Sequence, residues 1–128
     1  MPTPTDRQPR QPGPPRGAGP TAAQLAASAA TFGLLASPVR LHLVWLITHG
    51  PYDVGTLANR AGIGVTTASQ HLGKLRLAGV ITARREGKRH FYAVDDPHVV
   101  TLVEQIFDHI APDGTSPPTR SPPAYSPC

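Results

Sequence analysis

Cysteine, long apolar runs and aromatic residues are all scarce in this sequence. Its one cysteine, Cys128, excludes a disulfide or a pair of thiolate metal ligands within one chain. No stretch of 18 apolar residues occurs, which argues against a spanning helix, and the proline-rich N-terminus does not resemble an export signal. We therefore expect a cytoplasmic protein that has no membrane contact.

The signatures of common enzyme classes are also missing. There is no P-loop, no glycine fingerprint for a dinucleotide and no nucleophile elbow. The His, Asp and Ser residues do not pair at spacings that indicate a catalytic triad. We predict that the protein is not an enzyme.

Proline is abundant, and it is concentrated at the two ends of the chain. Of the 16 prolines, seven fall in residues 1–20 and six in residues 112–128, and neither segment contains Leu, Ile or Val. Such segments bury too little apolar surface to offset the entropy lost on folding. We expect disordered Pro-rich tails at 1–20 and 112–128, with a single domain at 21–111.

The charges are divided between two regions of that domain. Residues 60–90 carry one acid, Glu86, against Arg60, Lys74, Arg76, Arg84, Arg85, Lys88 and Arg89. Residues 91–113 carry no Lys or Arg, but contain Asp95, Asp96, Glu104, Asp108 and Asp113. The first region suits a polyanion and the second suits cations, although either could be solvated surface only.

Hydrophobic spacing and capping residues predict a mainly α fold with a small β-hairpin. Ser37-Pro38 is typical of a helix start, and Gly50-Pro51 and Gly79 of helix ends. The expected helices are 21–35, 38–48, a short one from about residue 53, 65–78 and 97–110, and the expected hairpin strands are 80–85 and 90–94. The order ααααββα, with the hairpin directly after a helix-turn-helix, is that of a winged helix.

The helix at 65–78 is the candidate reader of DNA. At about 100° per residue, Ala68, Leu72 and Leu75 share one inward face, and no acid occurs between Val65 and Arg85. Hydroxyls and amides read base edges in the major groove, and lysine neutralises phosphate. The predicted DNA-binding residues on the outward side are Thr66, Thr67, Ser69, Gln70 and Lys74, with Ser69 and Gln70 as the main base readers. His71 lies nearer the inward face and is expected to be packed.

The hairpin supplies the second half of the predicted interface. Arg84, Arg85, Lys88 and Arg89 gather at its tip, where they can clamp the DNA backbone or enter the minor groove. Taken singly, each polar residue could be solvated surface. The turn, the acid-free helix and the adjacent basic hairpin together favour DNA binding.

These two segments resemble a known family. Residues 66–81, TTASQHLGKLRLAGVI, resemble the recognition helix of the ArsR/SmtB repressors, and residues 85–94 resemble the wing of that family. The resemblance extends over about residues 30–110. It implies a homodimer joined through its first and last helices, bound to a palindromic operator in double-stranded DNA and released when an inducer binds.

The same resemblance implies a metal site on the last helix. The family pattern is matched at Asp96, His98 and His109, and fails at its fourth position, which is Pro112. Asp113, Asp108, Glu104, a tail residue or water could take that place. His98 and His109 are eleven residues apart and therefore share a helix face. Oxygen and nitrogen ligands without thiolate suit nickel, cobalt or zinc.

The sequence therefore predicts a sequence-specific DNA-binding transcriptional repressor that responds to a metal of the nickel, cobalt and zinc class. One alternative is an ArsR-like regulator without its own metal site, which responds to another signal or to a co-regulator protein. A second alternative is a winged-helix protein-interaction module. The steep salt dependence of phosphate contacts separates DNA binding from that last function.

Overall fold

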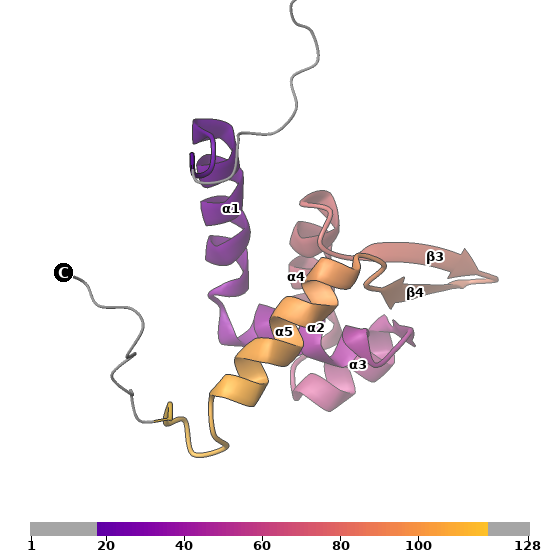
Figure 1. The fold of residues 1–128 in the computed structure, drawn as a ribbon. Helices are drawn as coiled ribbons and strands as arrows, with labels where there is room; N and C mark the ends of the chain where they lie inside the picture. The colour runs from indigo at the N-terminus through magenta and orange to yellow at the C-terminus, as the bar shows by residue number, and fades with distance from the viewer. Residues whose placement is uncertain (1–17, 118–128) are drawn as a thin grey trace, which may run out of the picture. The chain divides into compact units, whose positions relative to one another are not determined.

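The computed structural model describes residues 18–117, so most of both predicted tails, and Cys128, lie outside the described part of the chain. The chain divides into two units, one ending at Leu35 and the other beginning at Ala36. Figure 1 shows one helix, α1, in the first unit and the remaining helices and strands in the second. Each unit is described separately below.

The first unit contains helix α1 (Ala22–Leu35). It begins with a reciprocal cap, in which Thr21 N–H donates to Gln24 Oε1 (2.8 Å) and Gln24 N–H donates to Thr21 Oγ1 (3.0 Å). Of its large apolar residues, Leu25 and Phe32 are each 58% exposed, whereas Leu35 is buried.

Helix α2 (Pro38–Thr48) opens the second unit, at the expected residue. Ser37 is its N-cap and accepts the Arg40 N–H at 3.3 Å, and Pro38 occupies the first turn, where a missing N–H costs nothing. The helix buries Leu43, Val44, Leu46 and Ile47. Helix α2 contacts the other three helices of the second unit and one strand of its sheet, and these contacts explain why so many of its side chains are apolar.

The helix-turn-helix follows, as predicted. Asp53 caps α3 (Val54–Ala61) by accepting the Thr56 N–H at 2.9 Å. The turn that follows requires a left-handed residue, which Gly62 supplies with a φ of 71°. Helix α4 (Val65–Leu77) then presents Ala68, Leu72 and Leu75 to the core, each 0% exposed.

The predicted hairpin is confirmed, with its strands displaced by one or two residues along the chain. Strands β3 (Thr82–Glu86) and β4 (Arg89–Ala93) are antiparallel and joined by a two-residue turn. A third strand, β2 (Tyr52–Asp53), pairs with the other side of β4, so that the sheet order is β2-β4-β3. The sequence did not predict β2.

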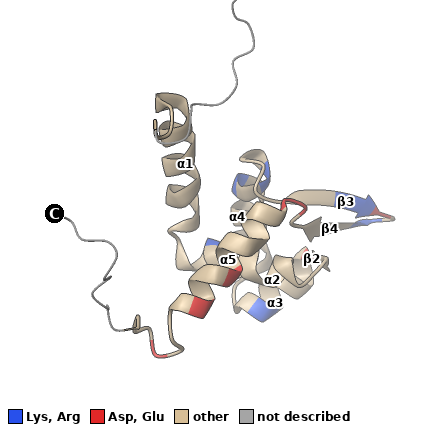
Figure 2. Ribbon diagram, in the orientation of Figure 1, with Lys and Arg blue, Asp and Glu red and all other residues tan. Residues whose placement is uncertain are grey.

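Helix α5 (Pro97–His109) is capped by Asp96. Val103 is its buried residue, and α5 packs against α2. Three large apolar side chains of α5 are partly exposed: Leu102, Ile106 and Phe107, at 38%, 40% and 44%. The acids of α5 appear in red in Figure 2.

The described residues form the mainly helical winged fold that the sequence predicted. The core of the second unit draws on all four of its helices and on the start of the wing, with Leu43, Ile47, Leu57, Leu72, Leu75, Ile81 and Val103 fully buried. No single helix within residues 18–117 has the length and apolar character to cross a membrane. Among the described residues, one bent pair of helices, α1 with α2, meets the test by length and composition.

Candidate nucleic-acid interface

The outward side of α4 carries the residues that the sequence proposed as DNA readers. Thr66, Thr67, Ser69, Gln70 and Lys74 are all exposed, whereas the inward residues of the same helix are buried. Gly73 also lies on the exposed side, and a Cβ built there would meet no atom within 4 Å. This side of the helix is therefore polar, free of acids and exposed to solvent.

The wing holds its four basic residues in different ionic environments. Arg84 Nε lies 2.8 Å from Glu86 Oε2, in an ion pair that is exposed to solvent. Arg85 Nε donates to the Gly87 carbonyl at 3.0 Å. Within residues 18–117, neither Arg85 nor Lys88 is paired with an acid. Figure 2 shows the basic residues gathered towards the free end of the wing.

Arg89 links the wing to the helix-turn-helix. Its Nε lies 3.5 Å from Asp53 Oδ2, and the Asp53 side chain is only 15% exposed. Hydrogen bonds from the side chain and backbone of Thr56, together with the positive charge of Arg89, hold the pKa of Asp53 below its usual value of 3.8. Asp53 therefore stays ionised at neutral pH and interacts with both Thr56 and Arg89.

A polar cavity of about 300 Å³ lies where α3, α4 and the wing meet. Its lining combines Ser69 of α4 with the wing residues Lys88 and Arg89, and is completed by Asp53, Val54, His90 and Tyr92. The structure thus brings a predicted base reader and two predicted backbone contacts to one concave surface. The sequence did not single out His90 or Tyr92, because their position beside α4 depends on the pairing of β2 with β4.

His71 behaves as the sequence predicted for a residue near the inward face of α4. It is half-buried, and its Nδ1 lies 3.4 Å from Arg40 Nη1 of α2. This contact ties α4 to the central helix of the second unit. His71 therefore packs within the fold, whereas its neighbour Gln70 is exposed.

Comparison with known proteins agrees with this geometry. Residues 35–84 match the family described as a helix-turn-helix domain. The chain is 35% identical over 82 residues to the cadmium resistance transcriptional regulatory protein CadC homolog of Staphylococcus aureus, covering 63% of this chain and 68% of that protein. The chain is also similar to a homodimeric winged helix-turn-helix DNA-binding domain from Mycobacterium bovis, which is described as a possible ArsR-family regulator. The two have 34% sequence identity and a TM-score of 0.62, and the match covers 70% of this chain and 85% of that one. The chain belongs to the ArsR/SmtB family of winged helix-turn-helix regulators.

A further relative of this ArsR/SmtB protein is the biofilm growth-associated repressor of Xylella fastidiosa. The two are 40% identical over 73 residues, which cover 57% of this chain and 64% of the repressor. The chain thus spans slightly less than two thirds of that relative. All three of these relatives are named as DNA-binding domains or transcriptional regulators, in agreement with the prediction that the protein is not an enzyme.

The residues proposed as metal ligands lie at the N-cap of α5 and on the helix itself, and the described residues of one chain do not form a complete site. Asp96 Oδ1 accepts the His98 N–H at 2.8 Å and lies 3.0 Å from His98 Nδ1. These bonds, the backbone one foremost, hold the pKa of Asp96 below 3.8. His109, eleven residues later, lies about 16 Å further along the helix axis. Within the described part of the chain, no three His, Cys, Asp or Glu residues are placed to hold one metal ion.

Proposed function

We propose that this ArsR/SmtB protein is a homodimeric transcriptional repressor that binds an operator through α4 and the wing. The observation that carries the proposal is the exposed, acid-free side of α4, together with the cavity in which Ser69 of that helix meets Lys88 and Arg89 of the wing. The major groove of B-DNA admits an α-helix, and in this proposal the wing meets the flanking backbone.

The chemistry of each exposed residue on α4 suits a different part of the duplex. The Gln70 amide can donate to N7 and accept from N6 of adenine, and the Ser69 hydroxyl can pair with several base edges. Lys74 lies one turn after Gln70 and suits a phosphate. In this proposal Thr66 and Thr67, at the start of α4, add hydrogen bonds from their hydroxyls to the DNA backbone, or apolar contacts between their methyl groups and the methyl group of thymine.

We propose that the dimer forms through α1 and α5. Support comes from the exposed apolar side chains on both helices, Leu25 and Phe32 on α1 and Leu102 and Ile106 on α5. Apolar surface of this kind marks a protein interface. The Mycobacterium bovis relative is described as a homodimer. Two copies related by a twofold axis would read an operator that is itself palindromic.

The decisive experiment measures operator binding by the double variant Ser69→Ala/Gln70→Ala. We expect it to lose preference for the operator over a scrambled duplex while keeping weak, salt-sensitive binding to both, with an unchanged circular dichroism spectrum. Thr101→Ala on the exposed part of α5 is the matched control and should retain full preference. Binding that does not weaken with salt would instead favour a protein-interaction module.

We further propose that DNA binding responds to a divalent ion of the nickel, cobalt and zinc class, held by Asp96, His98 and His109 from two chains. The proximity of Asp96 to His98 supports one half of such a site. A relative named for cadmium resistance supports metal response in the family. Because the described residues of one chain bring together two of these ligands, Asp96 and His98, we propose that the partner subunit completes the site.

The metal proposal is tested by titrating each of the three ions into the wild type and into His98→Ala/His109→Ala protein. We expect the wild type to bind with a stoichiometry tied to the dimer, and the variant to lose that binding. His42→Ala, which removes an exposed histidine of α2, is the control. Equal binding by all three proteins would contradict the metal site and would favour a repressor that responds to another signal or to a co-regulator protein.

A further inference from the structure

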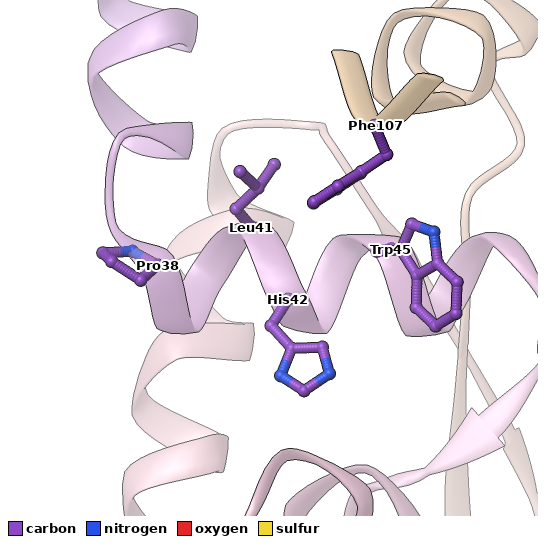
Figure 3. Close-up of a pocket in the computed structure, with 5 residues that line it drawn as sticks. All are labelled: Pro38, Leu41, His42, Trp45 and Phe107. Carbon is purple, nitrogen blue, oxygen red and sulfur yellow. The ribbon is translucent and has the colours of Figure 1, made fainter. Parts of the chain in front are cut away.

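Two adjoining cavities lie between α2 and α5, away from the DNA-binding surface. The larger, of about 500 Å³, is lined by Pro38, Leu41, His42, Trp45 and Phe107 and is almost entirely apolar. Figure 3 shows Phe107 reaching from α5 towards α2, where Leu41 and Trp45 lie on either side of it. The smaller, of about 300 Å³, shares Trp45 and Phe107 with the first.

The smaller cavity combines aromatic rings with carboxylates. Its lining comprises Trp45 and Phe107, the acids Glu104 and Asp108, and also His49 and Gln105. No Lys or Arg lines it, and none occurs anywhere in residues 91–117. The electrostatic environment of this cavity is therefore suited to a positive charge.

The aromatic groups are held in a defined arrangement. The Trp45 and Phe107 centroids lie 6.5 Å apart, with an interplanar angle of 73°. The His49 ring is tilted by 46° to the Trp45 ring with a centroid separation of 4.5 Å, and its Nδ1 lies 2.9 Å from the Trp45 carbonyl oxygen. Two rings nearly at right angles, beside carboxylates, form the arrangement that recognises an organic ammonium group through its π-faces.

We propose that this paired cavity binds a lipophilic organic cation. The cationic head lies in the smaller cavity against Trp45, Phe107 and the carboxylates of Glu104 and Asp108. Its apolar body fills the larger cavity beside Leu41. A neutral ligand would gain only the apolar contacts, and an anion would be repelled by both acids.

The charges favour such a ligand over a second copy of the chain as the occupant of this groove. Another α5 would bring no Lys or Arg to Glu104 and Asp108, so that their charges would remain uncompensated. At about 100° per residue, these two acids lie on the opposite half of α5 from Leu102 and Ile106. The apolar face proposed for dimerisation therefore remains available when the cation is bound.

Trp45 provides a direct signal because it is the one tryptophan of the chain. The experiment titrates the full chain with benzyltrimethylammonium and follows Trp45 fluorescence at fixed ionic strength. The comparison ligands are neopentylbenzene, which replaces the charged nitrogen by carbon, and the anion phenylmethanesulfonate. We expect saturable quenching by the cation, and binding at least about tenfold weaker for the other two. Equal binding of the cation and its neutral isostere would overturn the proposal.

Variants then locate the binding of the cation. Glu104→Gln/Asp108→Asn should weaken it about tenfold, whereas Asp113→Asn, beyond the end of α5, should leave it unchanged. Thermal unfolding of each variant checks that the fold is intact, and operator binding by Glu104→Gln/Asp108→Asn checks the DNA interface independently. An equal loss in all variants would indicate a general charge effect and contradict the site. Affinity that falls as protein concentration rises would show that a second copy covers the groove, which would also contradict it.

Discussion

Arg89 Nε of the wing lies 3.5 Å from Asp53 Oδ2, the residue that caps α3. Because Asp53 also accepts the Thr56 N–H, one carboxylate stabilises the start of α3 and holds the wing beside it. Asp53 thus stabilises both parts of the proposed DNA-binding surface, the helix-turn-helix and the wing. Mutations can separate its contribution as a helix cap from its contribution as an ion-pair partner.

We expect Asp53→Ala to lower the urea midpoint more than Arg89→Ala does. The first substitution removes both the helix cap and the ion pair, whereas the second removes only a contact whose arginine is 70% exposed. Asp53→Asn should lie between them, since the amide oxygen still caps α3. Equal midpoints for Asp53→Ala and Arg89→Ala would show that the cap contributes little.

The lowered pKa of Asp53 predicts a specific pH dependence. The carboxyl is more acidic in the folded chain than its usual value of 3.8, so the stability that it contributes is present above pH 3.8 and is lost as pH falls through the lower folded value. NMR titration of the carboxyl carbon measures this directly. Arg89→Ala should raise the pKa of Asp53 towards 3.8 without reaching it, because the hydrogen bonds from Thr56 remain.

The unequal pairing of the wing residues predicts unequal effects on DNA binding. Arg85→Ala and Lys88→Ala should each weaken binding to all sequences alike and reduce the slope of log K against log salt by about one. The double variant Arg84→Ala/Glu86→Ala removes an ion pair without changing the net charge and should leave the slope nearly unchanged. A larger effect from this control than from Lys88→Ala would mean that the wing meets the duplex by its other face.

Two leucines near the end of α4 give a matched test of the core. Leu75 is 0% exposed and Leu77 is 91% exposed. Leu75→Ala should cost about 2–5 kcal/mol of unfolding free energy, because it leaves a cavity, whereas Leu77→Ala should change it by less than about 0.5 kcal/mol. Urea denaturation checks both. A large loss from Leu77→Ala would reveal that another surface covers this residue.

Gly73 offers a variant in which stability and DNA binding should move in opposite directions. A Cβ at this position meets nothing within 4 Å, so Gly73→Ala should stabilise the helix by about 1 kcal/mol. On the same exposed side as Gln70, the added methyl group should hinder close approach of the duplex. Thermal unfolding and operator binding of the same sample measure the two effects. Unchanged affinity would place Gly73 outside the interface.

Much of this fold could be predicted from local signals. Ser37-Pro38 marks a helix start because capping depends on residues within one turn, and α2, α3 and α5 all begin where expected. The inward face of α4 was equally predictable, because Ala68, Leu72 and Leu75 recur at helical spacing.

Features that depend on distant partners could not be predicted in this way. Strand β2 has only two residues, too few for an alternating pattern, and it forms only because Tyr52 and Asp53 pair with Tyr92 and Phe91. The same pairing places His90 and Tyr92 beside Ser69. Likewise, Trp45 and Phe107 are far apart in the sequence, and only the packing of α2 against α5 makes their cavities.

The sheet order β2-β4-β3 leaves β3 as an outer strand with one unpaired backbone edge. Its last three residues, Arg84, Arg85 and Glu86, are all charged and exposed. Charged side chains on such an edge discourage strands of separate molecules from joining edge to edge. Variants in which the charged residues of β3 are replaced by neutral ones, made to weaken DNA binding, would also lose this barrier to edge-to-edge pairing. We expect such variants to aggregate more readily.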